Sequence, residues 1–162
     1  MPSDVMQALY EGRRADAEAL AAERPLDVFE AASLGDHGRL AELLRGDEAL
    51  AQVWSDDGFL ALHYACFFGS PDCTTTLLDA GAPIDEPSRN DMGVRPINSA
   101  AAGVHPIDNA RILLARGADV EGRQSSGHTA LDEAMIREDR ALIDLLRAHR
   151  PDATEPPSHR RR

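Results

Sequence analysis

Residues 58–65 read Gly58-Phe-Leu-Ala-Leu-His-Tyr-Ala65, and the chain repeats this pattern twice more. The later copies are Gly93-Val-Arg-Pro-Ile-Asn-Ser-Ala100 and Gly127-His-Thr-Ala-Leu-Asp-Glu-Ala134. Their leading glycines are 35 and 34 residues apart, and a period of this length is typical of solenoid proteins. The sequence therefore predicts one supersecondary unit that recurs along the chain.

A second landmark follows each copy. It reads Leu-Leu-Asp-Ala-Gly-Ala from Leu77, Leu-Leu-Ala-Arg-Gly-Ala from Leu113 and Leu-Leu-Arg-Ala-His-Arg from Leu145. Apolar residues around each landmark recur every three to four positions, which predicts an amphipathic helix. Each unit is therefore expected to hold a short first helix rich in small residues and a second helix with an apolar stripe. We expect Leu77, Leu113 and Leu145 to stack in neighbouring second helices.

Fainter copies precede these three. The offset of twelve residues between Ala65 and Leu77 also separates Ala31 from Leu43, and it recurs from Ala8. One helix pair cannot bury its own apolar face, so the pairs must stack. The sequence predicts an all-α solenoid of about five stacked helix pairs with finger-like turns, the first two pairs being degenerate and without a finger.

The repeat region is expected to form one domain over residues 1–150. Residues 151–162 contain three prolines and a closing run of arginines without an apolar period, and they predict a disordered tail. Glycines mark the ends of helices inside the domain. We expect Gly35 and Gly69 to stop first helices in the left-handed conformation, and Gly81 and Gly117 to end second helices.

These landmarks resemble the ankyrin repeat, whose unit opens with Gly-x-Thr-Pro-Leu-His-x-Ala and closes with Leu-Leu-x-x-Gly-Ala. The resemblance covers about residues 6–153 and is strongest over 56–146. It implies a concave surface, formed by the fingers and the exposed side of each first helix, that binds other proteins.

The chain also departs from the ankyrin pattern. Leu60 and Arg95 stand where the family has a threonine that caps the first helix. Asn98 and Asp132 replace the histidine that ties adjacent fingers, so we expect weaker ties there. Extra residues within 87–90 and 102–105 predict two protruding loops.

The amino-acid composition excludes several classes of function. The 162 residues carry 17 arginines and no lysine against 28 acidic residues, a formal charge of -11. Such a surface repels nucleic acid, and the lack of lysine excludes Schiff-base chemistry and Walker-type phosphate loops. The sequence contains no run of eighteen apolar residues, so it predicts no membrane-spanning helix. Two cysteines and no export segment favour a cytoplasmic protein with reduced thiols.

Catalytic and metal sites find little support. His63, Cys66 and Cys73 could supply three zinc ligands, but a fourth is missing and both cysteines fall at packing positions. The acidic pairs 56–57 and 85–86 lie in expected finger tips, where a solvated face is the simpler interpretation. No hydrolase, metalloprotease or nucleotide-binding motif is present. We therefore predict a protein without metal, cofactor or catalytic activity.

The candidate binding residues are acidic finger tips around an aromatic patch on the concave surface. Phe67 is expected to be exposed there, whereas Phe68 could instead fold back onto the next repeat. Trp54 and Tyr64 are interpreted as packing residues. The predicted partner-binding residues are Asp56, Asp57, Phe59, Phe67, Phe68, Asp91, Met92, Val94 and His128.

The leading hypothesis is a monomeric, non-enzymatic protein-binding module whose partner is basic at its rim and apolar at its centre. A dedicated inhibitor or immunity-type regulator of a single enzyme is the alternative, favoured by the acidic charge. The terminal arginines at 160–162 are interpreted as a solvated tail, with a hook for an anionic partner as the alternative.

Overall fold

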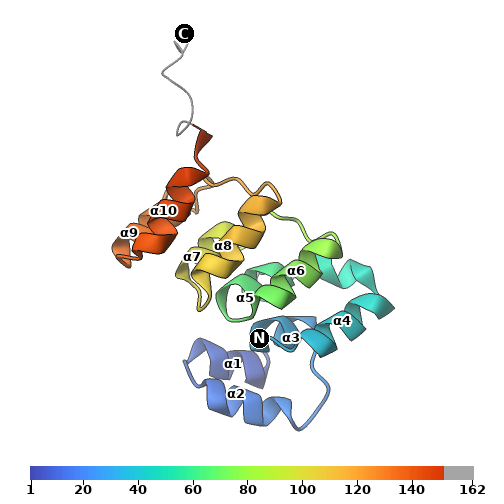
Figure 1. The fold of residues 1–162 in the computed structure, drawn as a ribbon. Helices are drawn as coiled ribbons and strands as arrows, with labels where there is room; N and C mark the ends of the chain where they lie inside the picture. Colours follow the sequence, from blue (N-terminus) through green and yellow to red (C-terminus); the bar gives the residue numbers. More distant parts are fainter. Residues whose placement is uncertain (152–162) are drawn as a thin grey trace, which may run out of the picture.

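The computed structural model describes residues 1–151 and contains ten α-helices in five consecutive pairs (Figure 1). The predicted all-α solenoid of helix pairs is confirmed. The described residues form no strand, and they contain one isolated antiparallel bridge, between Trp54 and Leu60. The predicted tail lies, apart from Pro151, outside the described residues. The helices are α1 (Asp4–Tyr10), α2 (Arg14–Ala21), α3 (Val28–Leu34), α4 (His37–Gly46), α5 (Ala61–Phe67), α6 (Pro71–Asp79), α7 (Pro96–Ala102), α8 (Pro106–Ala115), α9 (Ala130–Ile136) and α10 (Arg140–Ala148), with a 3-10 turn over Glu48–Gln52.

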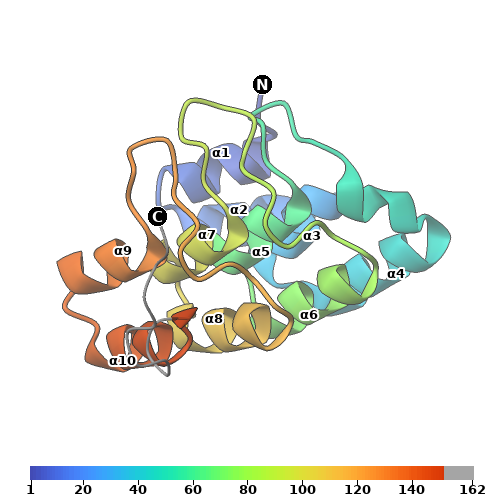
Figure 2. The same cartoon turned by 90° about the horizontal axis from the view of Figure 1, so that it is seen from above.

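The last four pairs form two rows of helices. The inner helices α3, α5, α7 and α9 pack side by side, and the outer helices α4, α6, α8 and α10 form the second row (Figure 2). Fingers at residues 53–60, 84–95 and 119–129 project beyond the inner row (Figure 2). We call the surface between the fingers and the inner helices the concave face. No helix in residues 1–151 is long and apolar enough to cross a membrane.

The outer helices stack as predicted, with one shift of register. Leu77 and Leu113 are fully buried, whereas in α10 Leu142 and Leu146 are fully buried and Leu145 is only partly buried. The expectation for Leu145 was therefore wrong by one position. The last repeat has lost its closing Gly-Ala, and the distance from the finger glycine, 19 residues for both Leu77 and Leu146, gives the correct register.

Glycine ends the first helices for two different reasons. Gly35 follows α3 with φ of 72°, the expected left-handed conformation. Gly69 does not have a positive φ, so the expectation for it was wrong. A Cβ at Gly69 would collide with the carbonyl oxygen of Ala32, so this glycine is required because two inner helices approach closely.

Side-chain hydrogen bonds link adjacent fingers at His63 and at Asn98. His63 Nδ1 accepts the Leu60 amide at 3.0 Å, and its Nε2 lies 3.0 Å from the carbonyl oxygens of both Glu86 and Val94 in the next finger. Asn98 occupies the corresponding position one repeat later. Its Oδ1 accepts the Arg95 amide at 3.0 Å and its Nδ2 donates to the Gly122 carbonyl at 3.3 Å, so Asn98 keeps a tie to the next finger, through one carbonyl where His63 reaches two.

Both loops with extra residues are hydrogen-bonded to the preceding repeat. In the loop over 87–90, Ser88 is buried and the Asn90 amide donates to the Asp57 carbonyl at 2.8 Å, so this loop is fastened to the preceding finger. The guanidinium of Arg89 stacks 4.1 Å above the Trp54 ring. In the loop over 102–105, the Val104 side chain is 58% exposed, but the Val104 amide donates to the Phe67 carbonyl at 3.1 Å and Gly103 is buried, so this loop is also held against α5.

Candidate functional site

The repeat register identifies two positions on each inner helix that face the concave side. Counting from the finger glycine, the first position holds Tyr64, Ser99 and Glu133, and the second holds Phe67, Ala102 and Ile136; α3 supplies Glu30 and Ser33 by alignment of Gly35 with Gly69. The second position is exposed at Phe67 (38%) and Ile136 (66%). Ser33 is fully buried, so α3 differs from the rest of the row.

A groove of about 400 Å³ follows these positions from α5 to α9. The inner helices form its floor, and the fingers and the N-terminal helix α1 form its walls. Most of the lining is aromatic or aliphatic. The lining residues are Tyr10, Phe59, His63, Tyr64, Phe67, Phe68, Met92, Val94, Asn98, Ser99, Ala102, Gln124 and Glu133.

The groove brings together five of the nine predicted binding residues, namely Phe59, Phe67, Phe68, Met92 and Val94. Phe67 and Phe68 meet edge to face, with ring centroids 4.7 Å apart and planes at 85°. Met92 is 57% exposed on the finger above them, whereas Val94, at the base of the same finger, is only 7% exposed. Phe68 is partly buried, but it packs toward the N-terminal helices and not onto the next repeat as its alternative had it.

The other four predicted residues lie outside the groove. Asp56 and Asp57 line a separate hollow of about 250 Å³ near the chain start, where Asp56 pairs with the amino group of Met1 at 3.3 Å. Asp91 and His128 are exposed on finger tips. These four residues therefore do not line the groove.

Tyr10 is the lining residue that sequence reasoning missed. Its hydroxyl donates to an Asp57 carboxylate oxygen at 3.1 Å and lies 2.9 Å from the Tyr64 hydroxyl, which in turn lies 3.0 Å from Ser55 Oγ. Burial raises the pKa of both tyrosines, so they remain protonated hydrogen-bond donors. The Tyr10 ring also contacts the Phe68 ring, with centroids 6.0 Å apart. Tyr10 thus closes one end of the groove.

Few of the residues that line the groove are ionisable. Glu133 is the only acidic lining residue, and no ion pair holds it within residues 1–151. Burial lowers the pKa of His63 to about 4, so this histidine is neutral at physiological pH. The groove therefore presents apolar walls and a single carboxylate.

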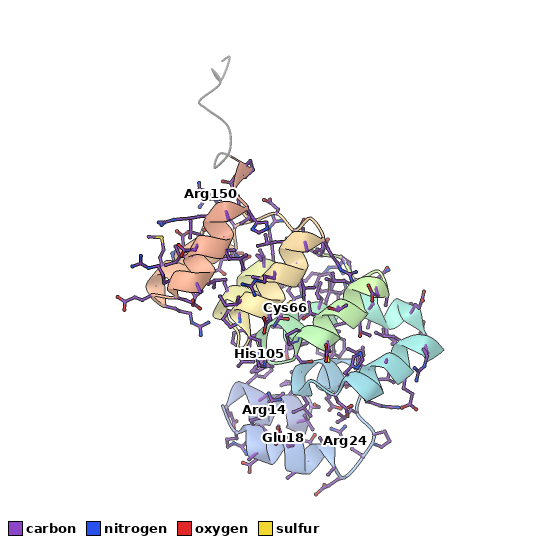
Figure 3. All side chains as sticks on the ribbon, viewed as in Figure 1. Arg14, Glu18, Arg24, Cys66, His105 and Arg150 are labelled. Atoms are coloured by element: carbon purple, nitrogen blue, oxygen red, sulfur yellow. The ribbon has the colours of Figure 1, made fainter. Side chains whose placement is uncertain are left out.

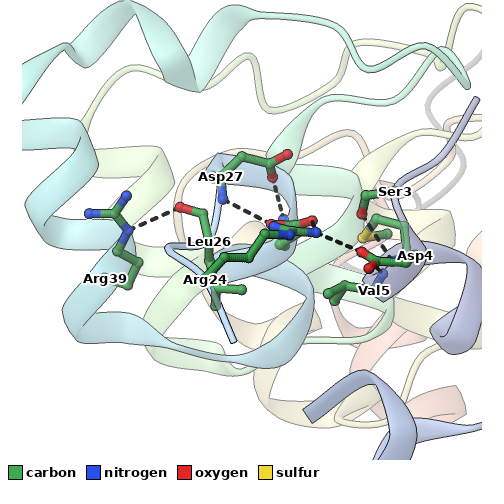
Figure 4. A network of polar contacts seen from close by, with 9 residues as sticks. Ser3, Asp4, Val5, Arg24, Leu26, Asp27 and Arg39 are labelled. Carbon is green, nitrogen blue, oxygen red and sulfur yellow. Dashed lines mark hydrogen bonds and ion pairs between the residues drawn. The ribbon is translucent and has the colours of Figure 1, made fainter. Parts of the chain in front are cut away.

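The α1–α2 pair, which we call the N-terminal hairpin, is fastened by polar contacts at its base. Arg24 donates to both carboxylate oxygens of the buried Glu30 at 2.8 and 2.9 Å and to Asp4 at 2.6 Å (Figure 4). These partners hold the pKa of the Glu30 carboxyl below its usual value despite its burial. Arg14, labelled at the start of α2 in Figure 3, donates to the carbonyls of Leu34 and Phe68. Arg14 thus provides hydrogen-bond donors for carbonyl oxygens at the C-terminal ends of two inner helices, which have no partner within the helix.

The cysteines pack in the solenoid core. Cys66 and Cys73 are fully buried and unpaired, and burial raises the pKa of Cys66 to about 12, so its thiol is a poor ligand and nucleophile. Within residues 1–151 no three His, Cys, Asp or Glu side chains come together in a way that could hold a metal ion.

Comparison with known proteins places the repeats in a family. A model described as "Ankyrin repeats (3 copies)" matches residues 28–124. A putative ankyrin repeat-containing protein of Treponema pallidum is 32% identical over 120 residues, which are 68% of this chain and 40% of that protein. The glycerophosphocholine phosphodiesterase gde1 of Schizosaccharomyces pombe is 39% identical over 90 residues, 54% of this chain and 8% of that protein. The chain thus spans less than half the length of either relative. With the finger ties of His63 and Asn98 and the two rows of stacked helices, these matches show that the chain belongs to the ankyrin repeat family.

Proposed function

We propose that this protein is a non-enzymatic module that binds a partner protein in the groove of its concave face. Ankyrin repeats generally mediate protein–protein interaction, and the family supplies the general role. The observation that carries the proposal is the groove itself, where Phe67 and Met92 stay 38% and 57% exposed beside partly buried aromatic rings. An exposed apolar patch on a rigid scaffold is a usual mark of an interaction site.

The centre of the partner surface should be apolar. Fully burying a Phe side chain contributes about 1.5–3 kcal/mol, whereas an exposed ion pair contributes about 0–1 kcal/mol. Phe67 and Met92 are therefore expected to determine affinity, and the walls around them to exclude water.

The rim of the partner should be basic. Asp56 and Asp91 are exposed on neighbouring finger tips, Asp57 is partly exposed beside them, and the whole chain carries a formal charge of -11. Charges at a rim act mainly on the association rate. Reversal of Asp56 and Asp91 to Arg should slow association and flatten its salt dependence; Asp57 is best retained because it accepts the Tyr10 hydroxyl.

Affinity purification from the native cell tests the proposal. Wild-type protein, Phe67→Ala and Val53→Ala serve as baits. Val53 is a matched control because it is also 38% exposed but lies outside the groove. We expect a protein that wild type and Val53→Ala retain and Phe67→Ala loses. Equal recovery by all three baits would contradict the groove as the binding site.

A dedicated inhibitor of one enzyme is the alternative, favoured by the acidic charge of the chain. A single enzyme recovered in stoichiometric amount and inhibited by the purified chain would favour it, and several unrelated partners would favour a general adaptor. We further propose a monomer in the cytoplasm, consistent with the two buried, unpaired thiols. Light scattering would test the oligomeric state.

A further inference from the structure

The N-terminal hairpin occupies part of the concave face. Ser33 on α3 corresponds in the repeat register to Phe67 on α5 and Ile136 on α9, which are 38% and 66% exposed, yet Ser33 is fully buried. Figure 2 shows α1 on the same side of the inner row as the fingers. The chain itself thus fills the concave face at its first inner helix and leaves it open from α5 onward.

The packing of α1 indicates what kind of segment the concave face can bind. Val5, Met6, Ala8 and Leu9 form its buried side, each at most 4% exposed, while Asp4 and Gln7 face solvent. The buried side joins one apolar cluster with Tyr64, Phe59 and Phe68. All three of these aromatic residues also line the open groove. The short amphipathic helix α1 is therefore held between its partner helix α2 and aromatic residues of the concave face.

We infer that the open groove receives a single amphipathic helix of the partner, which lies beyond Tyr10 and presents apolar residues to Phe67 and Met92 and a Lys or Arg to Glu133. This inference rests on the proposed function and specifies the partner. A helix laid in a groove is anchored by apolar residues at i, i+3 or i+4, and i+7, as α1 is by Val5, Ala8 and Leu9.

The size and charge of the groove support this occupant. Its volume of about 400 Å³ is at the lower end of the range for pockets that enclose small ligands, so it takes a few anchoring side chains rather than a folded domain. Glu133 is its one acidic lining residue, and Tyr10 bounds the other end. A cation at one end of an apolar stripe complements both features.

A peptide selection on the full chain tests the inference. A displayed library of random 16-residue peptides is selected, and the enriched sequences are synthesised and measured by fluorescence anisotropy. We expect apolar residues at helical spacing with a Lys or Arg beside them, and a central proline in the peptide should weaken binding by at least about tenfold. Phe67→Ala should weaken binding by at least about tenfold and Glu133→Gln by about three- to tenfold, while Glu138→Gln, outside the groove, should leave it within about twofold.

The outcomes separate the two claims. Enriched peptides that need Phe67 but tolerate proline and show no helical period would overturn the helix inference and leave the binding groove intact. Peptides that bind Phe67→Ala as well as wild type, while circular dichroism shows the variant folded, would overturn both claims. A library without any Phe67-dependent binder would also overturn the helix inference, since the affinity purification tests the proposed function independently.

Discussion

Replacement of His63 by Asn should remove a large part of the acid sensitivity of this protein. The imidazole is 2% exposed, accepts the Leu60 amide and faces two finger carbonyls, of Glu86 and Val94. Protonation would leave Nδ1 unable to accept the amide, and burial lowers the pKa of His63 from 6.5 to about 4. In the next repeat Asn98 accepts the corresponding amide and contacts one finger carbonyl without a titratable group, so the chain supplies its own model for the variant.

The size of the effect follows from linkage. Because the pKa of His63 is lower in the folded than in the unfolded chain, its contribution to stability is complete above pH 6.5 and is lost as the pH falls toward 4. Each pH unit within this window costs about 1.36 kcal/mol for one proton, so wild type should lose about 2 kcal/mol from this group between pH 7 and 4.5.

Urea unfolding followed by circular dichroism at pH 7 and 4.5 measures the difference. We expect His63→Asn to lose about 2 kcal/mol less than wild type over this interval, since the other five histidines are common to both proteins. Equal losses in the two proteins would refute the assignment of His63 as the buried neutral tie between fingers.

Three further predictions concern stability and thiol reactivity. Arg24→Met should cost about 2 kcal/mol in urea unfolding, because buried Glu30 loses two charge-assisted hydrogen bonds; a cost below about 0.5 kcal/mol would contradict this role. Gly69→Ala should cost at least about 1–3 kcal/mol, because the new methyl group meets a backbone carbonyl, whereas Gly46→Ala, with free space around the Cβ, should be neutral or stabilising by up to about 1 kcal/mol. Neither buried thiol should react with a thiol reagent at pH 8 until urea unfolds the chain, and Cys66→Ala should be mild; rapid labelling of the native protein would contradict the packing role.

The repeat period carries most of the information about the fold. It predicted the helix pairs, the fingers and the exposure of Phe67, because these features depend on contacts between equivalent positions of adjacent units. It was misleading where a landmark had been lost, as with Leu145 and Leu146. It also could not tell whether a glycine serves a left-handed turn, as Gly35 does, or a close backbone approach, as Gly69 does.

The N-terminal end of the groove was beyond sequence reasoning. The seat of α1 depends on contacts between Tyr10 and residues 47 and 54 positions away, and no copy of the repeat repeats that geometry. The short spacing between Ala8 and Ala31, only 23 residues, was the available sign that the first pair would depart from the regular stack. The pairing of Arg24 with Glu30 was likewise invisible because several acidic residues lie equally near in the sequence.

The most direct test of the binding groove is the dissociation constant of the recovered partner for wild type, Phe67→Ala and Val53→Ala, measured alongside the unfolding free energy of each. The groove predicts that Phe67→Ala binds at least about tenfold more weakly, about 1.4 kcal/mol, with little loss of stability, and that Val53→Ala binds like wild type. If Phe67→Ala instead unfolds the protein while its folded fraction keeps full affinity, Phe67 belongs to the core and the groove is not the binding site.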